Sequence, residues 1–311
     1  MHEESDPVRP GRGGDFVLSP APRTNLAGRV PVVRDAATAS RGGGPFLGEC
    51  RGEYRAAIPC ELVPSLGWKA RIGLIVLASD HTVEFEWRTL MQAAAEAEGG
   101  AESIAVHAAR IANDPEITTR SLAAMEARIT ATADLLLPGA AFDVIAYGCT
   151  SAAMLIGPDR VRDLVRAARP GVAVTEPVSA ALAAFGSLGV TRVAMLTPYM
   201  PEVDECLRTG FEAHGLAIPR MGSFSIPNDN DASRISPDSL FDAGMALAGD
   251  PAVEGLFVSC TSIRLAPVIG RLEAALGKPV TSSNMALGWH ALRLAGAEAS
   301  LAGHGRLFEP R

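Results

Sequence analysis

The sequence predicts an α/β protein of two pseudo-symmetric Rossmann-like domains, each with a mostly parallel sheet, and an active site in the cleft between them. Three observations predict this fold. Short apolar runs alternate with helical segments, and the order of these segments occurs twice. Each copy also contains an apolar run that ends in Cys-Thr-Ser, at residues 149–151 and 260–262. Continuous apolar runs are typical of strands buried on both faces of a parallel sheet.

The first series of segments opens with the apolar run at residues 71–79. Asp80 or Thr82 is suited to cap the helix that follows, Pro158 suits the first turn of a later helix, and Gly189 suits a helix stop. The expected strands are 71–79, 103–111, 143–148 and 172–175, and the expected helices are 84–98, 118–137, 158–168 and 177–188.

The second series has the same character and begins at residue 192. Its expected strands are 192–199, 221–226, 255–259 and 279–283, its expected helices are 201–214, 236–248, 264–276 and 285–294, and a polar loop is expected at 228–231. We therefore expect domains at 70–176 and 177–284, followed by a closing helix and tail at 285–311. The closing helix at 285–296 is expected to be able to pack back on the first domain. Residues 1–69 are rich in Gly and Pro clusters, which predicts a disordered N-terminal extension.

Composition excludes several classes of protein. The net charge of −7 over 311 residues does not suit a nucleic-acid surface, and no apolar run is long enough to cross a bilayer. Without a signal pattern, the cytoplasm is the expected compartment. Five cysteines without a C-x-x-C pair predict neither a disulfide framework nor a zinc site. The histidines lack metal-ligand spacing and no nucleotide-binding loop is present, so we expect no metal and no cofactor.

The two Cys-Thr-Ser motifs predict thiol chemistry. In an open parallel sheet, ligands bind at the carboxyl ends of the strands, and a helix that begins there lowers the pKa of a thiol. Cys149 and Cys260 would then face one ligand from opposite sides. One thiolate would remove a proton and the other thiol would deliver one, or one thiolate would add to a double bond. The residues that would hold a substrate carboxylate are Thr150, Ser151, Thr261 and Ser262.

Further candidates lie at the same edge of the expected sheets. Asp80, His81 and Thr82 follow the first strand, and Tyr199 follows the strand at 192–199. His81 is either an acid–base group or substrate contact, or a solvated histidine. The phenol of Tyr199 suits a substrate carboxylate, with a packing role as the alternative. Asn230 lies either in a loop that closes over the ligand or in a plain surface turn.

These motifs resemble the aspartate/glutamate racemase superfamily over residues 71–296, and most of all its branch of maleate cis–trans isomerases and ectoine-utilisation proteins (EutA). The resemblance implies a cofactor-independent homodimeric enzyme with a small carboxylate substrate. It also implies Cys149 as nucleophile, Cys260 as proton donor, and Tyr199 and Asn230 as substrate contacts. Arylmalonate decarboxylases resemble this pattern too, but use only the cysteine of the second unit, which argues against them.

One departure from the isomerase pattern bears on the substrate. The isomerases carry Ser-Asn-Thr-Thr after the first strand, where this chain has Ser79-Asp80-His81-Thr82. A carboxylate repels the substrate carboxylate that an amide accepts. Asp80 therefore favours the ectoine-utilisation branch and a cationic amidine or amino substrate.

Three alternatives stay open on the sequence. The first is a maleate isomerase, and the second is a non-catalytic sensor of a small ligand, because the same architecture serves binding proteins. The third is a redox switch in which Cys149 and Cys260 form a disulfide.

Overall fold

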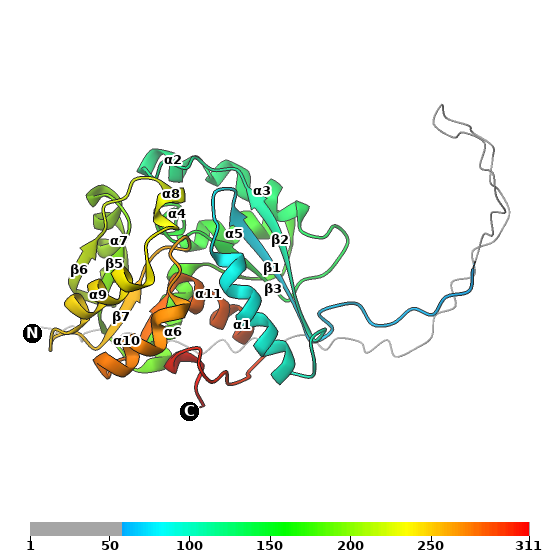
Figure 1. Cartoon of the computed structure of the whole chain (residues 1–311). Coiled ribbons are helices and arrows are strands. Elements are labelled where there is room, and N and C mark those ends of the chain that lie inside the picture. The colour runs from blue at the N-terminus through cyan, green and yellow to red at the C-terminus, as the bar shows by residue number, and fades with distance from the viewer. Residues whose placement is uncertain (1–57, 311) are drawn as a thin grey trace, which may run out of the picture. The chain divides into compact units, whose positions relative to one another are not determined.

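Eight parallel strands form two four-stranded sheets in the computed structural model, which describes residues 58–310 (Figure 1). The strand order is β2-β1-β3-β4 in the first sheet and β6-β5-β7-β8 in the second, so both sheets follow one topology. The strands are β1 (Ala70–Leu77), β2 (Ile104–Ile111), β3 (Val144–Gly148), β4 (Ala173–Thr175), β5 (Arg192–Thr197), β6 (Ala217–Ser223), β7 (Gly255–Val258) and β8 (Val280–Ser282).

Helices connect the strands of each sheet, because a chain can reach a parallel neighbouring strand only by crossing over the face of the sheet. Those of the first half are α1 (Val83–Ala97), α2 (Thr119–Ala123), α3 (Glu126–Leu135), α4 (Thr150–Ile156), α5 (Pro158–Ala168) and α6 (Pro177–Leu188). Those of the second half are α7 (Pro201–Ala213), α8 (Asp229–Ala232), α9 (Pro237–Ala248), α10 (Ile269–Leu276) and α11 (Ser283–Leu294), with short 3₁₀ turns η1 (Ala266–Val268) and η2 (Arg306–Phe308).

The register of the strands brings the candidate site residues to one edge of each sheet. In the first sheet Val76 of β1 pairs with Gly148 of β3, so Cys149 lies just beyond the carboxyl edge. In the second sheet Leu196 of β5 pairs with Val258 of β7, which places Cys260 beyond the equivalent edge. The central strands β1, β3, β5 and β7 are almost wholly buried because helices cover both faces.

The last helix, α11, connects the two halves of the fold. It packs against α6, α1 and β3, and it also contacts β8, from which it continues. Figure 1 shows α11 between the two sheets, with α1 and α6 beside it. Its buried polar residues, among them Asn284, therefore lie where residues of both halves meet.

Four expectations about local structure are wrong in detail. The helix expected at 118–137 is broken into α2 and α3 by a turn at Ala124 and Met125. The strand expected at 221–226 begins earlier, at Ala217, and the polar loop at 228–231 contains the short helix α8. Cys260 is followed by a turn and then by η1, not directly by a helix.

The chain from Ser65 onward forms one compact unit by its internal contacts, and the described residues 58–64 lie outside that unit. Most of the N-terminal extension expected at 1–69 lies outside the described residues. Within residues 58–310, no helix is long and apolar enough to cross a membrane.

Candidate active site

Cys149 lies at the junction of β3 and α4, where it is the residue that caps the helix N-terminus. Its side chain is 3% exposed. Burial raises the pKa of the thiol to about 12, although a hydrogen bond from the Ala152 N–H acts in the opposite direction. The expectation of a lowered pKa is therefore wrong for this closed site, because desolvation of a thiolate outweighs the helix N-terminus.

Cys260 follows β7 and is buried to the same degree. Its pKa is also raised, first by burial and then by the negative charge of Asp229. Hydrogen bonds from the Tyr199 hydroxyl and the Ser262 N–H to the sulfur act in the opposite direction. Both cysteines are free thiols in the structure.

Both thiols line one small pocket, to which Ser151, Tyr199 and Thr261 also contribute. The hydroxyl of Tyr199 hydrogen-bonds both Ser151 and the Cys260 sulfur, so the phenol links the two halves of the site. The free space is about 20 Å³, which is enough for about one water molecule. This is a closed site that must widen to admit a substrate.

Apolar side chains and a pair of loops close the pocket. Ile117, Leu122 and Met125 form part of its wall. Glu116 forms an antiparallel bridge with Asn228, and the Ile117 N–H donates to the Pro227 carbonyl across the two halves. These contacts join the two halves next to Ile117 and Asp229, which both line the pocket.

Asp80 is 3% exposed and does not line this pocket, but its charge acts on both thiols. Its Oδ1 accepts hydrogen bonds from the N–H groups of Thr82 (2.7 Å) and Val83 (2.9 Å), so Asp80 rather than Thr82 caps α1. No hydrogen bond to Oδ2 is present within the described part of the chain. Burial raises the pKa of this carboxyl to about 6, and its negative charge raises the pKa of both cysteines.

Asp229 is a site residue that the sequence analysis missed. It is 3% exposed and lines the pocket. Its two carboxylate oxygens accept hydrogen bonds from the hydroxyls of Ser262 (2.5 Å) and Ser79, one from each half. Among the residues of the described chain that line this pocket, none is Lys, Arg or His. The only available signal was its position beside Asn230.

The threonines of the two Cys-Thr-Ser motifs reach across to the opposite half. The Thr150 hydroxyl donates to the Ser283 hydroxyl (2.7 Å), and the Thr261 hydroxyl donates to the Gly148 carbonyl (3.3 Å). The structure therefore gives these hydroxyls a role in joining the halves, which differs from the expected contact with a substrate carboxylate. Ser151 remains beside the thiol, with its Oγ 3.8 Å from the Cys149 sulfur.

His81 and Asn230 lie together at the surface. The His81 Nε2 is 2.9 Å from the Asn230 Oδ1, and both residues are exposed. Thr82 is buried, and its hydroxyl donates to the Ser262 carbonyl (2.8 Å). The structure brings these three residues to the same edge, but only Thr82 is in direct contact with the Cys260 turn.

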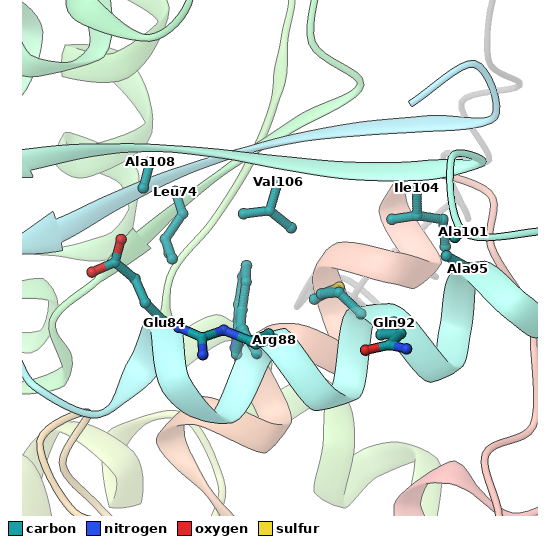
Figure 2. A pocket seen from close by; sticks show the side chains of 11 residues that line it. Leu74, Glu84, Arg88, Gln92, Ala95, Ala101, Ile104, Val106 and Ala108 are labelled. Carbon is teal, nitrogen blue, oxygen red and sulfur yellow. The ribbon is translucent and has the colours of Figure 1, made fainter. Parts of the chain in front are cut away.

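A larger groove of about 340 Å³ lies elsewhere, between α1 and β2 (Figure 2). Its wall is mainly apolar, with Leu74 and Val106 on the strands and Arg88 and Gln92 on the helix. It contains no cysteine, and none of the expected site residues lines it. We therefore place the candidate active site at the smaller pocket.

Two matching α/β halves, with a buried thiol at the carboxyl edge of each sheet, define a class of two-sheet α/β proteins with paired cysteines. Within that class, this chain belongs to the family described as arylmalonate decarboxylase, which matches residues 92–308. The prediction of the racemase-like superfamily is confirmed at the level of this family. The family match places this chain together with the arylmalonate decarboxylases, while the presence of both cysteines stays the sequence feature that sets it apart from them.

Relatives of known activity align with the chain to different extents. It is 33% identical over 141 residues to the arylmalonate decarboxylase of Bordetella bronchiseptica, an alignment that covers 45% of this chain and only 59% of that protein. It is 26% identical over 247 residues to the maleate isomerase of Pseudomonas putida, covering 76% of this chain and 96% of the isomerase. These relatives are isomerases and decarboxylases, and the prediction of an enzyme is confirmed.

Solved structures show the same architecture. A maleate isomerase from Pseudomonas putida S16, solved with maleate, has a TM-score of 0.70 at 24% identity and covers 77% of this chain and 97% of its own, which establishes the fold alone. A cysteine variant of the Nocardia farcinica maleate cis–trans isomerase, with a covalently bound succinylcysteine intermediate, has a TM-score of 0.69 at 28% identity and covers 77% and 98%. The predicted fold class is confirmed.

Proposed function

We propose that this protein is a cofactor-independent two-cysteine racemase or isomerase of the ectoine-utilisation (EutA) type, acting on a small carboxylate by proton transfer between thiols. The observation that carries the proposal is the pair of buried thiols, Cys149 and Cys260, which line one closed pocket. The carboxylate of Asp80 does not line this pocket, but its charge acts on both thiols. The resemblance to the racemase superfamily also supports a homodimer. We keep the cytoplasm as the proposed compartment.

The reaction proceeds in two proton transfers. One cysteine, as thiolate, removes the proton next to the substrate carboxylate, and the electron pair of the C–H bond moves into the carboxylate to give an enediolate. The thiol of the other cysteine then donates its proton to the opposite face and becomes the thiolate. Configuration inverts, and the proton and charge are balanced because the two cysteines exchange roles. Hydrogen-bond donors at the site, among them Tyr199 and Ser151, are suited to stabilise the enediolate oxygens.

The charges around the thiols favour a substrate that carries a positive group. Burial is the main reason that the pKa of Cys149 is raised, and the carboxylates of Asp229 and Asp80 add to it. A second substrate carboxylate would raise the thiol pKa further, whereas an amidinium or ammonium group beside Asp80 would offset these charges. A zwitterionic substrate would therefore lower the pKa of the thiol and so help to form the thiolate that removes the substrate proton.

A maleate cis–trans isomerase is the second candidate. The observation in its favour is the alignment with maleate isomerases over 95% to 96% of their lengths in two species of bacteria. In that reaction the Cys149 thiolate would add to one carbon of the double bond while the Cys260 thiol protonates the other. After rotation about the resulting single bond, the Cys260 thiolate would take the proton back and the C–S bond would break, which restores the double bond and the Cys149 thiolate. The carboxylate of Asp80 opposes binding of the dianion.

Proton exchange in D₂O, followed by NMR at neutral pH, tests the proposal. The compounds are ectoine, hydroxyectoine, their ring-opened amino acids, aspartate and maleate, each with wild type, Cys149→Ser and Cys260→Ser. We expect deuterium to enter the α-position of one zwitterionic compound, with inversion lost in both variants. Cys206→Ser, which changes a cysteine of α7 outside the pocket, is the matched control and should behave as wild type.

Other outcomes would decide against this function. Conversion of maleate to fumarate, with no exchange in the other compounds, would establish the isomerase instead. Binding of a compound without exchange or conversion would indicate a sensor. A disulfide between Cys149 and Cys260 in the oxidised protein, with no turnover in the reduced protein, would indicate a redox switch.

A further inference from the structure

Glu86 is a buried carboxyl group that the proposed reaction does not use. It lies on the inward face of α1 and is 4% exposed. It does not line the pocket that holds the cysteines. An acidic side chain is rarely buried so fully unless specific partners hold it.

Both carboxylate oxygens of Glu86 accept hydrogen bonds from the second half of the fold. Its Oε1 accepts from the Ala266 N–H at η1 (2.8 Å), and its Oε2 accepts from the Asn284 Nδ2 at the start of α11 (2.8 Å). The same Asn284 Nδ2 donates a second hydrogen bond to the carbonyl of Thr261 (2.8 Å). Glu86 is thereby connected through one amide to the residue that follows Cys260.

The orientation of the Asn284 amide depends on Glu86. The Asn284 Oδ1 has no hydrogen-bond partner in the described chain, while the Nδ2 faces two acceptors. Turning the amide over would place its oxygen against the carboxylate and the Thr261 carbonyl, which are both acceptors. The indole N–H of the adjacent Trp87 donates to the Asn284 main-chain carbonyl (2.9 Å) and fixes the residue from a second direction.

The two cysteines differ in what holds their backbone. Cys149 begins α4, so the residues after it are held by the hydrogen bonds of the helix. Cys260 precedes a turn, whose carbonyls at Thr261 and Ser262 are instead held by the side chains of Asn284 and Thr82. The turn after Cys260 therefore depends on side chains from the start of α1 and from α11. The residues after Cys149 have the hydrogen bonds of α4 in addition to the contact of Thr150 with Ser283 of α11.

We propose that Glu86 is a positioning residue, which through Asn284 fixes the Cys260 turn and so directs the Cys260 thiol into the pocket. The role in turnover rests on the proposed function, whereas the effect on the Cys260 thiol does not. Glu86 touches neither substrate nor reacting atoms, and its contribution is made through the Asn284 amide.

The test compares the two thiols of one protein after the change Glu86→Gln. The glutamine has the same shape, but presents an N–H₂ group to one of two donors, so one of the two hydrogen bonds is lost. Alkylation by iodoacetamide is followed for each cysteine separately by peptide mass spectrometry. We expect the Cys260 rate to increase about fivefold or more, because the turn opens more readily, and the Cys149 rate to change by less than about twofold.

Further variants test whether the effect is specific to the link between Glu86 and Asn284. Glu84→Gln is the matched control, because Glu84 lies on the same helix but pairs with Arg110 at the surface, and it should leave the ratio of the two rates unchanged. Asn284→Ser should reproduce the effect of Glu86→Gln. The double variant should be no more affected than Asn284→Ser alone, because both changes remove the same link.

Equal acceleration of both thiols in Glu86→Gln would overturn the proposal, since a residue that only stabilises the fold would act on both. An unchanged ratio in Glu86→Gln and Asn284→Ser would overturn it as well. Once a substrate is known, we expect kcat of Glu86→Gln to fall at least about tenfold, with KM changed by less than about threefold. Absence of turnover in wild type would reject the proposed function and leave the alkylation result intact.

Discussion

At the scale of single residues, Asp80 combines a role at the start of a helix with an electrostatic effect on both thiols. One oxygen caps α1, and the negative charge raises the pKa of both Cys149 and Cys260. In the related maleate isomerases the resemblance places an asparagine at this position. The choice between a carboxylate and an amide there affects both the substrate that binds and the ease with which a thiolate forms.

Replacing Asp80 by asparagine should make both thiols more reactive. The introduced amide keeps an oxygen to cap α1, while the negative charge is lost, so the pKa of both thiols falls. At pH 8 we expect iodoacetamide to label each cysteine about 3- to 10-fold faster than in wild type, since one pKa unit corresponds to a tenfold change in thiolate.

The pH dependence of that difference has a definite sign. The pKa of Asp80 is about 6, so its carboxyl group is neutral below this pH and charged above it. The ratio of labelling rates, Asp80→Asn over wild type, should approach one below pH 6 and rise as the pH increases. Asp114→Asn changes an exposed carboxylate at the pocket rim and serves as the control. A ratio that stays constant from pH 5 to pH 8 would contradict the role given to the Asp80 charge.

At the scale of elements, the contact between α1 and α11 carries the polar links described above. Gly288 on α11 faces α1, and a Cβ atom there would lie 2.5 Å from Leu90 Cδ2 and 3.2 Å from Trp87 Nε1. Both neighbours are fully or almost fully buried. The absence of a side chain at residue 288 therefore lets the two helices approach closely enough for Trp87 to reach Asn284.

Gly288→Ala should destabilise the protein. The added methyl group has no room unless Leu90 and Trp87 move, and such overpacking costs about 1–3 kcal/mol of the free energy of unfolding. Gly270→Ala on α10 is the opposite case, because a Cβ there meets nothing within 4 Å, and it should stabilise by about 0.5–1 kcal/mol through helix propensity. Urea unfolding of both variants measures the difference, and a stabilising effect of Gly288→Ala would show that α1 and α11 are less closely fixed than the structure implies.

At the scale of the whole molecule, the two sheets follow one topology but do not stand apart. Residues of both halves exchange buried hydrogen bonds at Thr150–Ser283, Thr261–Gly148 and Glu86–Asn284. The expectation of separate domains at 70–176 and 177–284 remains a proposal about how the repeat is organised. Energetically, each half leaves buried polar groups without partners when the other half is removed.

We expect the chain to unfold in a single cooperative transition. Separate unfolding of one half would leave these buried groups unpaired, and so would be unfavourable compared with unfolding of both. Far-UV circular dichroism, which follows all helices, and the fluorescence of the three tryptophans, Trp68, Trp87 and Trp289, should give coincident urea curves. A fluorescence transition that is clearly displaced from the circular dichroism transition would establish independent units.

Local signals in the sequence determined most of the architecture. Apolar runs fixed the existence of all eight strands, and Pro158, Pro177, Pro201 and Gly189 marked helix ends where the structure has them. Cys149, Cys260, Ser151 and Tyr199 were identified because they follow strands whose carboxyl ends meet in a parallel sheet. These features depend on residues that are close together along the chain, and therefore they can be predicted from the sequence.

Only the tertiary structure decided the environment of the site. A turn at Ala124 and Met125 breaks a helix that is continuous by pattern, and burial raises the pKa of the Cys149 thiol, which a helix N-terminus alone would lower. Asp229 and Glu86 became visible only when segments far apart in the sequence met. Desolvation and hydrogen bonding between distant segments depend on which groups surround a residue in space, and this information is not contained in any local stretch of the sequence.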